Sequence, residues 1–89
     1  MDIRLTPTVI GNLTINRSAV LTNAFFQFGN KIANYTFNVY LVDEDYKIVE
    51  GNNINPVQQI AIISENDFLP AFENLSYAMP LIEEQSKLW

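Results

Sequence analysis

The chain has 89 residues, a formal net charge of −5 and a pI near 4.3, and it contains eleven Asn but neither His nor Cys. It therefore lacks the imidazole and thiol groups most often used as general bases, nucleophiles and transition-metal ligands, and it can form no disulfide. The acidic balance disfavours nonspecific binding to nucleic acid or to anionic lipid.

At this length we expect a single domain, residues 1–89, with one modest core and slender stability. Packing or partner chains have to supply any missing stability, because disulfide and thiolate-zinc support are absent. With 48% hydrophobic and 17% charged residues, the surface must rely on uncharged polar groups. Such a surface tolerates burial against another protein.

Residues 3–10 alternate between apolar and polar side chains, which is typical of a half-buried strand, and Pro7 marks an edge position. Gly11 and Asn12 favour a tight turn, after which the apolar alternation resumes. We therefore predict a small N-terminal hairpin. The alternative is that residues 1–17 form an arm that is ordered only against a neighbouring subunit. The first ten residues do not have the pattern of a signal peptide, and no segment has the length of a membrane span.

Residues 19–28 carry apolar side chains at both strand parities, which predicts a strand covered on both faces. The core would cover one face. A sandwich layer, a covering helix or a neighbouring subunit would cover the other, and the sequence leaves these alternatives open. Residues 29–31, Gly-Asn-Lys, favour a turn.

Residues 35–42 give the clearest strand pattern of the chain, with one continuous apolar face. The acids at 43–45 then favour a turn, and residues 46–49 are expected to return as the second strand of a β-hairpin that ends at Gly51-Asn52-Asn53. After a loop, residues 57–63 read as another strand, although a short helix also fits their pattern.

From Ser64 the apolar residues follow the spacing 4, 3, 4, 3, which predicts a helix lying on a core. They are Phe68, Phe72, Leu75, Met79 and Ile82. Asn66 or Asp67 can cap this helix, and Pro70 is acceptable in its first turn. Pro80 is expected to end or kink it, with a second short helix over 81–87.

The acids at 43–45 do not form a calcium-binding loop, because Lys47, Ile48 and Ile54 stand where an oxygen ligand, the sharp-turn Gly and the terminal Glu are needed. A solvated turn is the expected role of these acids. The four serines have no His to act as base, and the three glycines are isolated. We predict no catalytic residue, no metal site and no cofactor.

Six large apolar side chains are the expected contact residues of a protein interface. They are Phe25, Phe26, Phe28, Tyr40, Leu88 and Trp89. Trp89 has two alternatives, because it either packs on its own helix or core or anchors in a pocket of a neighbour, where Trp often dominates the binding energy.

The block NVYLVDEDYKIVEGNN, with the helical end from Phe68, resembles small structural proteins of tailed bacteriophages. The resemblance rests on Val39 to Gly51 and on that helical end, about half of the chain, and the Asn-rich, Cys-free and His-free composition is similar to that of proteins from AT-rich phage genomes. It implies a virion part made in the host cytoplasm, such as a head auxiliary, connector, collar or tail component. Its partners would be itself and other virion proteins in a multi-copy assembly, without direct contact to nucleic acid or membrane.

The expected fold is mainly β with a minor α part: a small antiparallel β-sandwich or barrel-like sheet with one or two short C-terminal helices. The expected function is that of a noncatalytic phage virion structural or assembly protein acting through protein-protein contacts. One alternative is a small acidic inhibitor or adaptor that binds a host nucleic-acid enzyme. Another is an accessory enzyme subunit or carbohydrate-binding module with Tyr40, Tyr46 or Tyr77 as a stacking platform.

Overall fold

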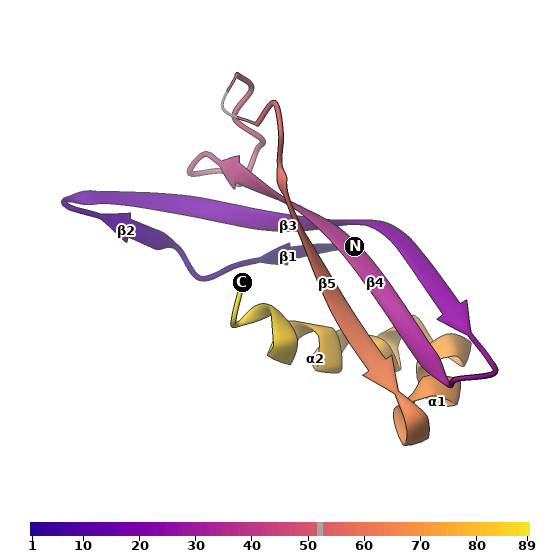
Figure 1. The fold of residues 1–89 in the computed structure, drawn as a ribbon. Coiled ribbons are helices and arrows are strands. Elements are labelled where there is room, and N and C mark those ends of the chain that lie inside the picture. The colour runs from indigo at the N-terminus through magenta and orange to yellow at the C-terminus, as the bar shows by residue number, and fades with distance from the viewer. Residues whose placement is uncertain (52) are drawn as a thin grey trace.

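A computed structural model describes residues 1–51 and 53–89 of the chain. It shows one open antiparallel sheet with two helices packed on one of its faces (Figure 1). The elements in chain order are β1 (Asp2–Arg4), β2 (Thr8–Ile10), β3 (Leu13–Gln27), β4 (Ile32–Val42), β5 (Val57–Ser64), the 3-10 turn η1 (Glu65–Asp67), α1 (Phe68–Glu73) and α2 (Leu75–Ser86). No helix in this described part of the chain is long and apolar enough to cross a membrane.

The predicted fold class, mainly β with two short C-terminal helices, is confirmed. The strands follow the order β1-β3-β4-β5, and β2 pairs with the far end of β3. Neither a second sheet nor closure into a barrel is seen among the described residues. The helices form the second layer instead, and one sheet with a helical cover already makes a core.

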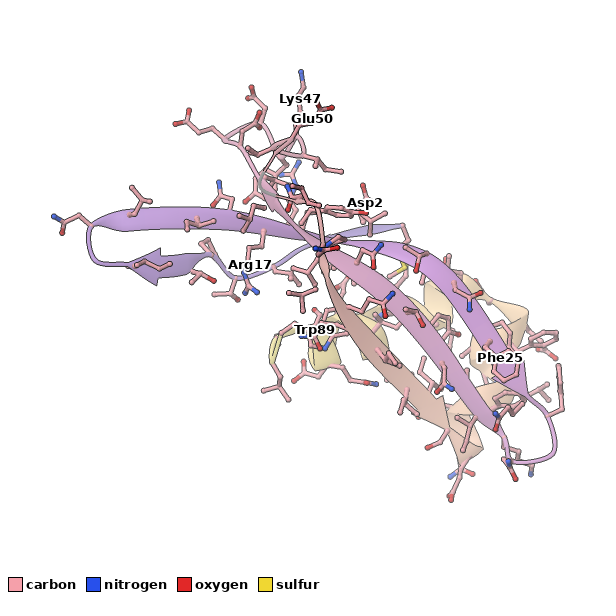
Figure 2. All side chains as sticks on the ribbon, turned by 45° about the horizontal axis from the view of Figure 1, so that its top comes forward. Asp2, Arg17, Phe25, Lys47, Glu50 and Trp89 are labelled. Carbon is pink, nitrogen blue, oxygen red and sulfur yellow. The ribbon has the colours of Figure 1, made fainter. Side chains whose placement is uncertain are left out.

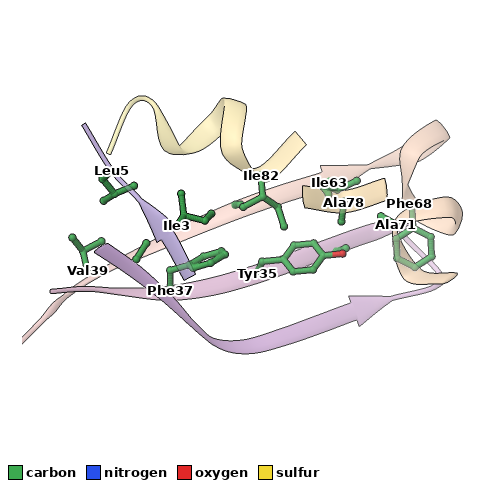
Figure 3. Packing of buried hydrophobic residues seen from close by; sticks show 13 residues of the cluster. Ile3, Leu5, Tyr35, Phe37, Val39, Ile63, Phe68, Ala71, Ala78 and Ile82 are labelled. Atoms are coloured by element: carbon green, nitrogen blue, oxygen red, sulfur yellow. The ribbon is translucent and has the colours of Figure 1, made fainter. Parts of the chain in front are cut away.

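The core lies between the sheet and the helices (Figure 3). Buried and half-buried residues alternate along most of β4, so Tyr35 and Phe37 point toward the helices while Asn34 and Thr36 point away. Ile82 and Ala78 of α2 face Tyr35 and Phe37 across the two layers (Figure 3). The full cluster is Ile3, Leu5, Ala19, Ala33, Tyr35, Phe37, Val39, Ala61, Ile63, Phe68, Ala71, Ala78 and Ile82.

The predicted N-terminal hairpin is confirmed, but the single strand expected over 3–10 is wrong, because residues 5–7, which include Pro7, separate β1 from β2. Ile10 pairs with Leu13 across Gly11 and Asn12, and Gly11 has a φ of +59°, as the first residue of a tight type II′ turn requires. The pairing of β3 with β4 begins only at Asn16, so the hairpin extends beyond the rest of the sheet (Figure 1). We call residues 8–15 the arm.

The strand predicted over 19–28 is part of a longer strand, because β3 runs without a break from Leu13 to Gln27. A bulge between Leu21 and Asn23 shifts the side-chain alternation by one residue. Leu21 and Phe26 therefore both pack toward the core although they have opposite parity. Much of the two-sided apolar pattern comes from this bulge, but Phe25 remains on the face opposite the helices.

The predicted return strand over 46–49 is wrong, since this segment contributes only a single bridge between Ile48 and Val42. Tyr46 has a φ of +60°, outside the strand region, and the Asp43 carboxylate accepts local backbone N–H groups that hold the turn together. The sheet partners of β4 are β3 and β5. The predicted end of the return strand at Asn52 lies outside the described residues.

The helical region begins at Phe68 as predicted, with Pro70 in the first turn of α1. The break comes at Asn74 and not at Pro80, so the expected helix boundary at Pro80 is wrong. Asn74 is extended, and its side chain accepts the Ser76 N–H at 2.9 Å, which caps the start of α2. Pro80 lies exposed inside α2, where water can solvate the carbonyl whose hydrogen bond is lost.

The break at Asn74 divides the predicted apolar stripe between two helices. Phe68 and Ile82 are buried as expected, but Phe72 and Leu75 are nearly half-exposed. Ala71 and Ala78 take the buried positions instead.

The first prediction concerns the Tyr35 hydroxyl, which is buried without a hydrogen-bond partner in the described residues, and burial raises the pKa of Tyr35. This pKa is higher in the folded than in the unfolded chain. The contribution of Tyr35 to the free energy of unfolding is therefore fully present below about pH 10, and it is lost as the pH rises through the pKa of the folded state. We expect the free energy of unfolding of Tyr35→Phe at pH 7 to equal that of the wild type or to be higher by up to about 1 kcal/mol. In urea unfolding between pH 8 and 11, the wild type should lose more stability than the variant.

Tyr40→Phe is the matched control for this measurement, because it removes a tyrosine hydroxyl from the same strand that does have a hydrogen-bond partner. The Tyr40 hydroxyl accepts a hydrogen bond from the Asn38 amide at 3.4 Å. A loss of more than about 1 kcal/mol in Tyr35→Phe at pH 7 would show instead that the Tyr35 hydroxyl has a partner.

Candidate interaction surface

The sheet face opposite the helices is uncovered by any element of the described chain and carries no charged side chain across β3, β4 and β5. The register aligns Phe25, Asn34 and Ile62 in one row across the three strands, and Asn23, Thr36 and Ile60 in the next. We call this surface the open face. It comprises Val20, Asn23, Phe25, Gln27, Ile32, Asn34, Thr36, Asn38, Gln58, Ile60, Ile62 and Ser64.

Three large side chains of the open face remain about half-exposed. Phe25 has 53% of its surface exposed (Figure 2), and Ile60 and Ile62 are similar. Full burial of such a side chain stabilises an assembly by about 1.5–3 kcal/mol relative to exposure. Asn34 and Thr36 of β4 separate Phe25 from these two isoleucines, so the open face is a mixed apolar and uncharged polar surface, which tolerates burial against another protein.

The arm is a second uncovered apolar surface. Val9 is 67% and Leu13 is 64% exposed, and Ile10 is similar. Residues 5–16 contain no charged side chain. Since side chains alternate along β3, Leu13 and Ile15 lie on the same side of the sheet as the buried Ala19, the side that the helices cover further along. An open groove of about 580 Å³ lies between the arm and the 41–49 segment.

The base of the arm is tied to the last residue of the chain by Arg17. Its guanidinium donates to the main-chain oxygen of Trp89 at 2.8 Å and to that of Thr6 at 3.0 Å (Figure 2). The Trp89 ring lies 5.2 Å from the Phe37 ring, so Trp89 packs on its own core, the first of its two predicted alternatives. Its neighbour Leu88 is 92% exposed.

A third apolar surface lies at the opposite end of β3 from the arm. The ring of Phe28 packs edge-to-face on Phe72 at 4.8 Å and on Phe68 at 5.3 Å. Phe28 and Phe72 are nevertheless about half-exposed, and so are Leu69 and Leu75. We call the surface formed by Phe28, Leu69, Phe72 and Leu75 the helical end.

Two side-chain amides bind backbone groups along the β5 side of the sheet. The Gln85 amide accepts the Ile62 N–H at 2.9 Å and donates to the Ile62 carbonyl at 2.6 Å. Beyond the start of β5, the Asn53 amide makes the same pair of bonds with Leu41, at 2.9 and 3.0 Å. Each amide takes the place of a neighbouring strand, which blunts an edge that could otherwise pair with another chain.

Sequence reasoning did not identify Gln85 or Asn53. The signal for Gln85 was its position three residues after Ile82, on the core-facing side of the predicted helix, where a polar side chain needs a partner. Asn53 has no comparable signal in the sequence, because it is the path of the loop that brings its side chain to the Leu41 backbone.

Two pairs of titratable groups lie on the surface. The Tyr77 hydroxyl donates to the Asp67 carboxylate at 2.6 Å, and this bond raises the pKa of Tyr77. The Lys87 ammonium lies 2.9 Å from the Glu84 carboxylate, which raises the pKa of Lys87. The acids at 43–45 are exposed in a turn as predicted. Within residues 1–51 and 53–89, no group of three or more acidic, His or Cys side chains is arranged to hold a metal ion.

The six predicted contact residues fall on different parts of the molecule. Phe25 and Tyr40 belong to the side of the sheet away from the helices, and Phe28 to the helical end. Phe26 is half-buried, with its ring 5.1 Å from that of Phe72. The structure therefore does not gather these residues with Leu88 and Trp89 into one patch.

Comparison with protein-family models, with curated proteins and with solved structures finds no match to this chain. The geometry of the chain's own surfaces therefore carries the functional conclusions.

The second prediction is that Gln85→Ala lowers the free energy of unfolding by about 1–2 kcal/mol, because it removes both bonds to the Ile62 backbone. Hydrogen exchange of the Ile62 amide should become faster. Gln58→Ala on the same strand is the matched control and should change neither quantity. Unchanged exchange at Ile62 in Gln85→Ala would mean that the amide does not protect this edge.

Proposed function

We propose that the chain is a noncatalytic structural subunit of a multi-copy protein assembly, with other copies of itself among its partners. The observation that carries the proposal is the arm, in which Val9, Ile10 and Leu13 are exposed on a hairpin without charged residues. Such a hairpin gains little by facing water, whereas each of these side chains stabilises a complex when a partner buries it.

The distribution of charge supports the same function. The chain carries ten acidic and five basic residues, yet the open face has none of them. Copies with a net charge of −5 repel one another, and uncharged surfaces are where they can approach with the smallest Coulomb cost. The open face and the arm are thus both suited to contacts inside an assembly.

A particle of a tailed bacteriophage is the assembly that the sequence resemblance suggests, with the chain as a head auxiliary, connector, collar or tail component located in the virion. The elongated shape, with extents of 46 × 22 × 19 Å, supports a role in which one subunit reaches onto its neighbours. Shells, rings and tubes use repeated contacts of this kind.

The third prediction is that the purified chain has a mass above the 10.2 kDa of one copy in size exclusion coupled to light scattering, and that this mass rises with concentration. Negative-stain images of the concentrated protein should show rings, tubes or sheets. A well-folded monomer at every concentration, with no affinity for phage heads or tails, would contradict the proposed function.

The fourth prediction separates assembly from the function of an acidic inhibitor that presents carboxylates to a nucleic-acid enzyme. Glu44 and Asp45 are exposed in the same turn, and neither carboxylate is in a hydrogen bond in the described residues. We expect Glu44→Lys combined with Asp45→Lys to keep the assembly, because the contacts are apolar and a smaller net negative charge reduces the repulsion between copies. Glu83→Lys is a control for charge reversal away from the turn, and loss of assembly only in the turn variant would contradict contacts made by apolar surfaces.

A further inference from the structure

The arm lacks a cover that the rest of β3 has. Its apolar side continues the side of β3 that packs on the helices at Ala19, but α2 ends at Ser86 near the base of the arm (Figure 1). Ile10 and Leu13 thus form a strip of sheet surface that has no helix on it. A half-apolar sheet surface is stable when a helix or another sheet packs on it.

The helical end lacks a sheet that would cover it. Leu69, Phe72 and Leu75 are apolar helix residues that remain about half-exposed beside the buried Ala71 and Ala78. Phe28 extends this surface from the turn after β3. The helical end is therefore a helical surface that no sheet covers, whereas the arm is a sheet surface that no helix covers.

These two surfaces cannot cover each other within one chain. The arm contains the first residues of β3, and Phe28 directly follows its last residue, Gln27. A strand of 15 residues spans about 50 Å, which is close to the 46 Å long dimension of the molecule. A contact between the arm and the helical end requires two molecules.

Charge selects the arm as the occupant of the helical end. Three acidic residues, Glu65, Asp67 and Glu73, occur in η1 and α1, and Lys31 in the adjacent turn offsets part of this charge. Two helical ends would therefore repel each other. The arm itself adds no charge, since no acid or base occurs between residues 5 and 16 and the nearby acids at 43–45 belong to a separate turn, so it meets this surface with less Coulomb repulsion than a second helical end would.

We propose that the arm of one copy packs against the helical end of the next copy, so that the chains associate head to tail. This inference rests on the proposed function and specifies its partner as a second copy of the chain. A head-to-tail contact uses two different surfaces, and repetition of it generates a closed ring or an open filament.

The test uses two variants that each remove one side of the contact. Ile10→Thr with Leu13→Thr removes the apolar arm, and Thr suits a strand. Leu69→Gln with Leu75→Gln removes aliphatic groups of the helical end, and Gln suits a helix. Far-UV circular dichroism is the control that both variants remain folded, and their spectra should match that of the wild type. We expect each variant alone to be monomeric in light scattering, because each lacks one half of the contact.

An equimolar mixture of the two variants should form a 1:1 dimer. Its mass should be twice that of a single chain, which is 10.2 kDa. The intact arm of one variant meets the intact helical end of the other, and the dimer cannot grow because both of its remaining ends are defective. Phe25→Thr with Ile62→Thr, on the open face, is the matched control and should keep the head-to-tail contact.

The outcomes separate this inference from the proposed function. If the wild type assembles but the mixture stays monomeric, head-to-tail association is wrong and the proposed function stands. Assembly that is lost in the open-face variant and kept in the arm variant would show that copies pack through their open faces instead, which also overturns the inference. A monomeric wild type at every concentration overturns both.

Discussion

The packing of two short helices on one side of a much longer strand is the constraint on which the rest of the structure depends. Helix α2 has 12 residues and is about 18 Å long, whereas the 15 residues of β3 span about 50 Å. The helices therefore cover one part of β3 and cannot reach the arm. They also cover only one face, which leaves Phe25 and its neighbours on the other. The uncovered surfaces follow from this mismatch in length, and no further element of the described residues corrects it.

Side-chain amides satisfy backbone groups at several points of this fold. Gln85 and Asn53 bind backbone groups at the ends of the paired region, and Asn74 caps α2. An amide both donates and accepts, so one side chain can satisfy a peptide N–H and a carbonyl together. The high Asn content thus has structural uses in this fold, and it leaves the open face polar without charge. That combination keeps the surfaces hydrated in a free chain while allowing them to be buried in an assembly.

Local patterns in the sequence predicted local structure well, and they failed where distant residues decide. The hairpin at Gly11, the strand over 35–42 and the helix start at Phe68 depend on turn chemistry and on side-chain periodicity, which are visible in a short window. The 46–49 segment makes only a single bridge to β4 and contains Tyr46 in a left-handed conformation, and short-range patterns do not reveal this. The bulge after Leu21 similarly changed which face an apolar residue occupies. The expected contact residues were chosen mainly for their size, so they did not include Val9, Ile10 and Leu13, although an N-terminal segment ordered against a neighbouring subunit was one of the alternatives.

The central claim is that a neighbouring molecule completes the cover of β3 that the chain's own helices leave unfinished. Hydrogen exchange measured by mass spectrometry at low and high protein concentration tests it most directly, because it reports on each segment of the unmodified chain. The account predicts that amides of the arm and of α1 exchange more slowly at high concentration, while those of β4, already paired on both sides, keep the same rate. Equal exchange of the arm at both concentrations, in a protein that light scattering shows to be assembled, would contradict the account.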